Sequence, residues 1–233
     1  MARQSAAQAP LRWRIVRALF ELLYRNRVLY WLASTIPFAG RWRTWQRLVL
    51  PRLRGRDVLE VGCGTGTLLA DMTAAGYTCA AVDRSPQMVA ATRSRLRRRY
   101  PSVAVRVQQA DVQALPFIDA SFDSVVSTFP TDYIFDPAAL GEIVRVLRPG
   151  GRLVVVLGAV LLPANILLLP FVAIQALVYG RAPALRPAAE TAADVQHADV
   201  LLSLLRAAGM EARREAVRTT SWEASLYIGE KSP

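Results

Sequence analysis

The sequence predicts an α/β protein with a doubly wound, seven-stranded, mostly parallel sheet. Short apolar segments of strand length alternate with helical segments over most of the chain, a pattern typical of parallel sheets covered by helices on both faces. The first apolar segment runs directly into a glycine-rich turn and a helix. Two strand patterns close together near the C-terminal end indicate an antiparallel hairpin at one edge of the sheet.

The expected elements follow one another closely along the chain. Strands are expected at 57–61, 79–82, 103–108, 122–128 and 152–157, with helices between them at 67–75, 86–99 and 137–147. Gly76 ends the first of these helices, and Ser85 caps the second, which has Pro86 in its first turn. A late helix at 199–208 stops before Gly209, and strands at 211–218 and 223–229 form the hairpin.

Positive charge is concentrated at the N-terminal end. Residues 1–56 carry twelve arginines and one acidic residue, Glu21, which accounts for the whole formal charge of +11. The remaining 177 residues hold equal numbers of basic and acidic groups. Arginines also interrupt the first twenty residues, which are therefore not typical of a signal peptide.

This basic end has amphipathic helical periodicity. An arginine stripe opposes an apolar stripe at 11–25, and at 42–49 one face carries Trp42, Trp45 and Val49. Arginine interleaved with tryptophan suits nucleic acid, through phosphate contacts and base stacking, or an anionic membrane surface. The simpler alternative is a helical cap that packs its apolar face on the rest of the protein.

A long uncharged segment interrupts the strand–helix alternation. Residues 153–180 contain no charged side chain, and after the fifth strand the apolar insertion, about 159–182, is too long for an ordinary loop. Pro163 and Pro170 interrupt it, and a single membrane span would put the following strands on the wrong side. We expect an apolar lid or re-entrant helix pair that dips into a membrane or covers a lipophilic ligand.

The glycine-rich turn is the first motif with chemical meaning. It follows the strand at 57–61 and precedes a helix, so its glycines allow close approach of a ligand to the helix N-terminus. Asp83 ends the next strand, where nucleotide-binding folds of this kind place a ribose-binding carboxylate.

With these motifs the chain resembles the class I S-adenosylmethionine-dependent methyltransferases, whose fold is Rossmann-like. It is most similar to the branch that contains the ubiquinone/menaquinone C-methyltransferases and many small-molecule enzymes, methyltransferase type 11. Five blocks, in the expected order and spacing between about Arg56 and Leu157, carry the resemblance: 60–66, 83–88, 110–117, 121–123 and 145–151.

The resemblance implies a binding site for S-adenosylmethionine. Its amino-acid portion would meet Glu60, Gly62, Cys63, Gly64 and Gly66. Asp83 would accept hydrogen bonds from the ribose hydroxyls, and Phe129 would lie near the sulfonium. Arg84 and Met88 would line the adenine. Asp111 and the Val112 backbone would form hydrogen bonds with the adenine amino group.

Candidates for contact with the methyl acceptor are Asp132 and Tyr133, which follow the fourth strand. The alternative is that Asp132 caps the next turn and Tyr133 packs. Relatives often carry a histidine in this region, whereas His197 is the only histidine of this chain and is more typical of a surface or capping residue. No histidine, cysteine and carboxylate cluster has metal-ligand spacing, so we expect no metal.

We therefore divide the chain into an N-terminal basic amphipathic helical cap that associates with a membrane, residues 1–55, and a methyltransferase domain, 56–233. The predicted function is methyl transfer to a lipophilic acceptor, a lipid headgroup or a quinone-like ring, by a cytoplasmic enzyme on the inner face of a membrane. A soluble small-molecule methyltransferase is the alternative. An RNA methyltransferase ranks below it because of the apolar insertion, and DNA is not expected as a partner.

Overall fold

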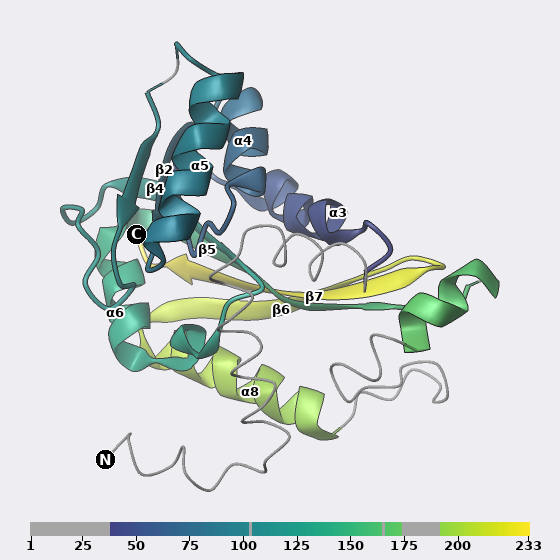
Figure 1. The fold of residues 1–233 in the computed structure, drawn as a ribbon. Helices are drawn as coiled ribbons and strands as arrows, with labels where there is room; N and C mark the ends of the chain where they lie inside the picture. The colour runs from purple at the N-terminus through teal and green to yellow at the C-terminus, as the bar shows by residue number, and fades with distance from the viewer. Residues whose placement is uncertain (1–37, 103, 165, 174–191) are drawn as a thin grey trace, which may run out of the picture.

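The protein is a three-layer structure with a central sheet (Figure 1). A computed structural model describes residues 38–102, 104–164, 166–173 and 192–233, with the side chains of 192–199 left out. The strands are β1 (Asp57–Val61), β2 (Thr78–Asp83), β3 (Arg106–Gln109), β4 (Phe122–Thr128), β5 (Leu147–Leu161), β6 (Met210–Arg218) and β7 (Trp222–Lys231). The helices are α3 (Trp42–Gln46), α4 (Thr67–Ala74), α5 (Pro86–Arg99), α6 (Pro137–Val146) and α8 (Ala192–Ala207), with 3₁₀ turns η2 (Arg47–Arg52), η3 (Asp132–Phe135) and η4 (Ile166–Leu168).

The strand order is β3-β2-β1-β4-β5-β7-β6. Strands β1 to β5 pair in parallel, and β7 is antiparallel to both β5 and β6. The predicted fold class, a doubly wound sheet with a terminal antiparallel hairpin, is therefore confirmed. The strand order reverses between β1 and β4, and folds of this kind bind ligands beyond the carboxyl ends of the strands at that point.

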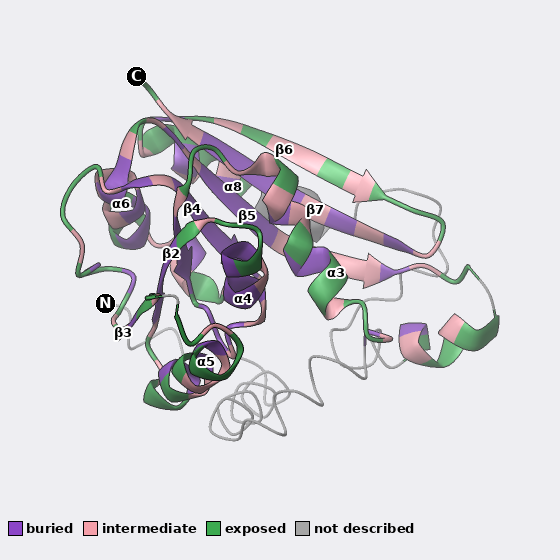
Figure 2. Ribbon diagram, turned by 90° about the horizontal axis from the view of Figure 1, so that it is seen from above, coloured by how far each residue is buried: buried purple, intermediate pink, exposed green. Residues whose placement is uncertain are grey.

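Alternating strand residues form a separate core on each face of the sheet. Val58, Val126 and Val154 pack with α3, α4 and α5, whereas their neighbours Leu59 and Val125 pack with α6 and α8. Figure 2 shows the buried residues concentrated in the central strands, while β6 at the edge alternates between partly buried and exposed. Burial on both faces explains why these strands are continuous apolar runs.

Several expected boundaries change in the structure. The third strand, expected at 103–108, spans Arg106–Gln109. The fifth strand was expected at 152–157, but β5 begins at Leu147 and extends to Leu161, because β7 continues the ladder with Leu161 opposite Trp222. The apolar insertion therefore contributes its first residues to the sheet. The late helix, expected from residue 199, begins at Ala192 instead.

The described part of the basic segment packs on the sheet. Trp45 and Val49 are fully buried in the core beneath α3, as the periodicity predicts. On the opposite face, Arg43 donates from Nε to Oδ2 of Asp71 in α4 at 2.9 Å. Residues 1–37, including the amphipathic pattern at 11–25, lie outside the described residues.

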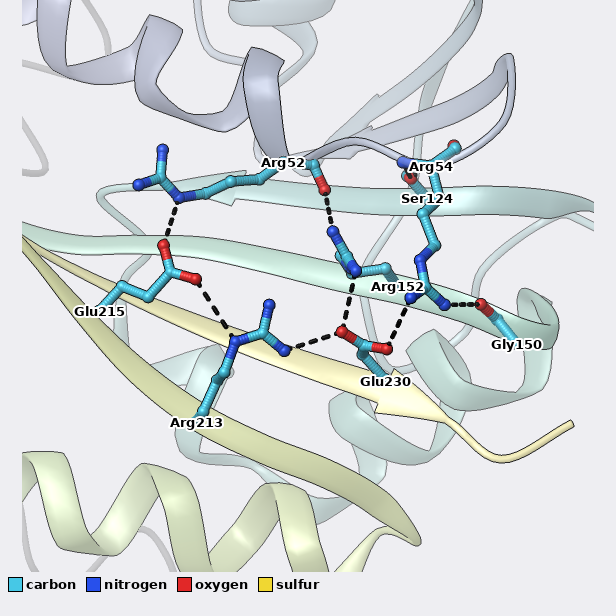
Figure 3. A network of polar contacts seen from close by, with 8 residues as sticks. All are labelled: Arg52, Arg54, Ser124, Gly150, Arg152, Arg213, Glu215 and Glu230. Carbon is cyan, nitrogen blue, oxygen red and sulfur yellow. Dashed lines mark hydrogen bonds and ion pairs between the residues drawn. The ribbon is translucent and has the colours of Figure 1, made fainter.

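A network of ion pairs joins the end of this segment to the terminal strands (Figure 3). Arg52 Nε lies 2.7 Å from Glu215 Oε2 on β6, and Arg54 Nη2 lies 3.0 Å from Glu230 Oε2 on β7. Arg152 of β5 contacts Glu230 at 2.9 Å and donates a second hydrogen bond to the Arg52 carbonyl oxygen. The segment therefore has fixed contacts at both ends, with α4 and with the hairpin.

The described part of the apolar insertion is only partly covered. Val172 is buried in the same core as Trp45, whereas the side chains of Ile166, Leu167 and Leu169 are 79%, 76% and 47% exposed. No helix within the described ranges has the length and hydropathy needed to cross a bilayer. The rest of the insertion, from residue 174, lies outside these ranges.

Candidate cofactor and acceptor site

The glycine-rich turn between β1 and α4 has the backbone conformation that its glycines allow. Gly62, Gly64 and Gly66 have φ angles of +71°, +53° and +71°, a region that other residues rarely adopt. A Cβ atom at Gly66 would lie 2.5 Å from Cγ2 of Thr92, so α5 leaves no room for a side chain there. Sequence and packing therefore both require glycine at this position.

Helix α5 supports this turn with two residues that the sequence analysis did not single out. Thr92 Oγ1 donates to the Gly64 carbonyl oxygen at 2.8 Å, and Arg95 Nε donates to the Thr65 carbonyl oxygen at 2.8 Å. Thr92 is fully buried although it is polar. Their spacing of three residues on one face of a helix next to the turn is the signal that could have revealed them.

Asp83, at the end of β2, joins the turn to the start of α5. Its Oδ2 accepts from the Gly64 amide at 2.8 Å, and its Oδ1 accepts from the Ser85 amide at 2.9 Å. Burial raises the pKa of Asp83, and these two hydrogen bonds oppose that shift. Each oxygen keeps a further lone pair, so the carboxylate can still accept hydrogen bonds from a ligand.

Glu60 lies on β1 directly before the turn and is the most unusual ionisable group of the site. Its side chain is 1% exposed, and Oε2 has no hydrogen-bond partner. Burial, together with the nearby Asp83 carboxylate, raises the pKa of Glu60 to about 8. A cation placed here would restore the ionised form, because an opposite charge stabilises a buried carboxylate.

The predicted adenine-binding residues gather beside Asp83. Met88 is buried in the first turn of α5, and Arg84 is exposed. The loop after β3 is held to Asp83 by the Ala110 amide, which donates to the Asp83 carbonyl oxygen at 3.2 Å. This bond brings exposed Asp111 and buried Val112 to the same end of the sheet.

Phe129 lies one residue beyond the end of β4, next to β1. Its φ angle of +52° is uncommon for a residue with a side chain, and its amide donates to the Val156 carbonyl oxygen at 2.8 Å. The ring stacks on Trp42 of α3, with ring centroids 4.0 Å apart and planes inclined by 25°. The residue predicted to lie near the sulfonium therefore also contacts the N-terminal segment.

The two acceptor candidates occupy different environments. The Tyr133 hydroxyl is 2.6 Å from Ser127 Oγ and 3.2 Å from the Val61 carbonyl oxygen, and a Cβ atom on Gly62 would lie 2.9 Å from it. Tyr133 thus packs directly against the turn. Asp132 is exposed at the start of η3, and Asp136 rather than Asp132 caps α6. Their contact with an acceptor stays a prediction.

Cys63 adds no nucleophile to this site. Cys63 is buried, and burial raises the pKa of its thiol well above the usual value, so the thiol stays protonated. His197 lies in helix α8, and its side chain is not among those that the structure describes. In the part of the chain that the structure describes, no three His, Cys, Asp or Glu side chains are arranged to hold a metal ion.

Comparison with known proteins assigns the class. Residues 59–155, from β1 into β5, match the family model described as a methyltransferase domain. Together with the strand order and the glycine turn, this match identifies residues 59–155 as a methyltransferase domain with the fold of the class I S-adenosylmethionine-dependent enzymes.

Among individual relatives, the demethylmenaquinone methyltransferase of Mycobacterium sp. (strain JLS) is 37% identical over 144 residues. The alignment covers 60% of this chain and 58% of that protein, so the chain spans less than two thirds of the length of the curated relatives it matches.

Solved structures confirm the fold at low identity. A SAM-dependent methyltransferase from Methanosarcina mazei is 18% identical, with a TM-score of 0.53 over 79% of this chain and 97% of that chain. Geranyl diphosphate C-methyltransferase from Streptomyces coelicolor A3(2), in complex with Mg²⁺, geranyl diphosphate and S-adenosyl-L-homocysteine, is 12% identical, with a TM-score of 0.55 over 82% of each chain.

The site suits the cofactor of this class. S-adenosylmethionine carries an ammonium group, a carboxylate and two ribose hydroxyls. The unpartnered Glu60 oxygen matches the ammonium, the N-terminal end of α4 matches the carboxylate, and Asp83 can accept hydrogen bonds from the hydroxyls. The turn leaves space for close approach because its glycines have no side chain.

Proposed function

We propose that the protein is an S-adenosylmethionine-dependent methyltransferase that acts on a lipophilic, quinone-like acceptor at a membrane surface. The observation that carries the activity is the arrangement of Glu60 and Asp83 around the turn. Glu60 Oε2 is buried without a hydrogen-bond partner, which is costly to the free protein. The Asp83 carboxylate is hydrogen-bonded to the turn and keeps lone pairs for a ligand. A cationic, hydroxyl-bearing cofactor would satisfy both.

The chain's own residues would position the reaction rather than perform covalent chemistry. When bound, S-adenosylmethionine supplies an electrophilic methyl group. The glycine turn, Glu60 and Asp83 would hold the cofactor, with Met88 and Val112 against its adenine. In this site the same residues would keep that methyl group next to a nucleophilic atom of the acceptor, and the proton that this atom loses on methylation would leave to solvent. Phe129, directly after β4, and Tyr133, in η3, would align the acceptor and exclude water.

The surroundings of the site and the names of the relatives support this acceptor class. The described insertion presents Ile166, Leu167 and Leu169 to solvent beyond the end of β5. Curated relatives that match this chain are named demethylmenaquinone methyltransferase. An apolar insertion that follows the carboxyl end of β5 supports a ligand that partitions into lipid.

A membrane location is supported by charge and apolar exposure together. Arg43 on α3 and its flanking residues Arg41 and Arg47 are exposed, and twelve arginines lie in residues 1–56. Exposed leucine and isoleucine side chains that enter a bilayer contribute about 1.5–3 kcal/mol each, and a nearby arginine about 1 kcal/mol at an anionic surface. We place the protein in the cytoplasm, peripherally bound to the inner face of the membrane.

The test combines binding and product identification. Calorimetry should show that Asp83→Ala weakens S-adenosylhomocysteine binding about a hundredfold, because two hydrogen bonds to a carboxylate are lost. Glu211→Ala, which removes an exposed carboxylate from β6, is the control and should bind normally. Equal affinity of the two variants would contradict the site.

The acceptor is then identified with methyl-labelled S-adenosylmethionine and a total bacterial lipid extract. We expect label in the quinone fraction with the wild type and not with Asp83→Ala. Label in added RNA or in a water-soluble metabolite instead would contradict the lipophilic acceptor while leaving the methyltransferase activity intact.

A further inference from the structure

A continuous aromatic cluster lies at the carboxyl ends of β4 and β5. Phe38 and Trp42 have ring centroids 5.0 Å apart, Trp42 stacks on Phe129, and Trp45 makes an edge contact with Trp222 at 6.3 Å. These rings come from three distant parts of the chain. Trp45 and Trp222 are buried, but Trp42 and Phe129 remain partly exposed, so they are the surface of the cluster.

The register of the sheet places this surface beside the cofactor turn. Glu60 of β1 is opposite Val126 of β4, so the residues that follow each strand, the glycine turn and Phe129, lie at adjacent strand ends. Cys63 of the turn belongs to the same apolar core that Phe129 packs against. The positive φ of Phe129 is a conformation of the kind that persists where the surroundings or a function require it.

A polar pair lies next to these rings. Gln46 Nε2 donates to Thr128 Oγ1 at 3.3 Å, and Thr128 directly precedes Phe129. Gln46 is 9% exposed, and its Oε1 is buried without a hydrogen-bond partner. A buried amide oxygen without a donor is unfavourable, which indicates a ligand hydroxyl as the missing partner.

Resting on the function proposed above, we infer that Trp42 and Phe129 form a stacking surface for a flat aromatic ring, and that Gln46 accepts a hydrogen bond from a hydroxyl on that ring. The acceptor is therefore a phenolic or hydroquinone-type ring and not a lipid headgroup amine, which has no ring to stack and would present a cation. The contacts of Arg43 with Asp71 and of Arg52 with Glu215 hold the segment that carries Trp42 and Gln46 in place.

The test uses two probes that differ only in the hydroxyl. The full-length protein, saturated with S-adenosylhomocysteine, is titrated with 1-naphthol and with 1-methoxynaphthalene. We expect the wild type to prefer 1-naphthol. Trp42→Ala should weaken both probes about tenfold, and Trp42→Phe should recover most of that loss, because a stacking ring is restored. Gln46→Leu should remove the preference between the probes.

Each variant has an internal check. A melting temperature and an affinity for S-adenosylhomocysteine equal to those of the wild type establish that the variant is folded and that its cofactor site is intact. Ile118→Ala, at an exposed position in the loop before β4, should bind both probes like the wild type. If Trp42→Ala binds naphthol normally, or Gln46→Leu keeps the preference, the stacking site is wrong. Failure of the wild type to bind S-adenosylhomocysteine would instead contradict the proposed function.

Discussion

At the scale of single residues, Glu60 shows how burial changes chemistry. Its carboxyl group is removed from water and lies near the Asp83 carboxylate, so its pKa rises to about 8. The free protein therefore holds a proton on Glu60 at neutral pH. In the unfolded chain the same group ionises near its ordinary value of 4.5. This difference links stability to pH.

The expected pH dependence follows from the sign of that shift. Between about pH 5 and 8 the folded protein keeps a proton that the unfolded chain has released, so the free energy of unfolding falls as pH rises. The slope from this group is at most about 1.4 kcal/mol per pH unit. Urea unfolding without cofactor from pH 5.5 to 8 should show a flatter slope for Glu60→Gln than for the wild type. Glu211→Gln serves as control, and an unchanged slope in Glu60→Gln would contradict the assignment.

At the scale of elements, the site depends on how the turn, α4 and α5 fit together. The sequence pattern predicts the turn and the helix, but the support of the turn comes from Thr92 and Arg95, which are distant in sequence. The segment 38–55 behaves similarly. Its own periodicity predicts a helix, whereas its attachment through Arg52 and Arg54 to the terminal strands arises only when the sheet has formed.

Two glycine-to-alanine substitutions separate backbone strain from helix propensity. Gly66→Ala meets a positive φ and the Thr92 side chain, so we expect a loss of about 1–3 kcal/mol and weaker binding of S-adenosylhomocysteine. Gly141→Ala lies within α6 with open space around it and should stabilise by about 0.5–1 kcal/mol. Thermal and urea unfolding measure both changes. Similar effects of the two substitutions would rule out the steric role of Gly66.

At the scale of the whole molecule, exposed apolar side chains lie at both ends of the parallel strands. Ile166 and Leu167 follow the carboxyl end of β5, on the side of the cofactor turn, whereas Ile118 precedes the amino end of β4. Because β4 and β5 are parallel, these positions lie toward opposite ends of the strands. A membrane that delivers an acceptor to the site would meet the carboxyl ends of the strands.

Vesicle flotation tests this orientation. The double substitution Ile166→Ser with Leu167→Ser should weaken binding to anionic vesicles at least about tenfold, because two apolar side chains no longer enter the bilayer. Ile118→Ser removes an equally exposed isoleucine near the amino end of β4 and should leave vesicle binding unchanged. Equal losses in the two proteins, or no vesicle binding by the wild type, would contradict the proposed membrane face.

The sequence by itself determined the sheet and the glycine-rich turn, because strand alternation and the glycine spacing are local signals read along the chain. Its five motif blocks indicated the class by resemblance. Strands β1 and β4 and helix α5 have the predicted bounds. Only the tertiary structure decided the length of β5, which depends on pairing with β7, and the meeting of Trp42 with Phe129. Such features depend on contacts between distant residues, and no local periodicity encodes them.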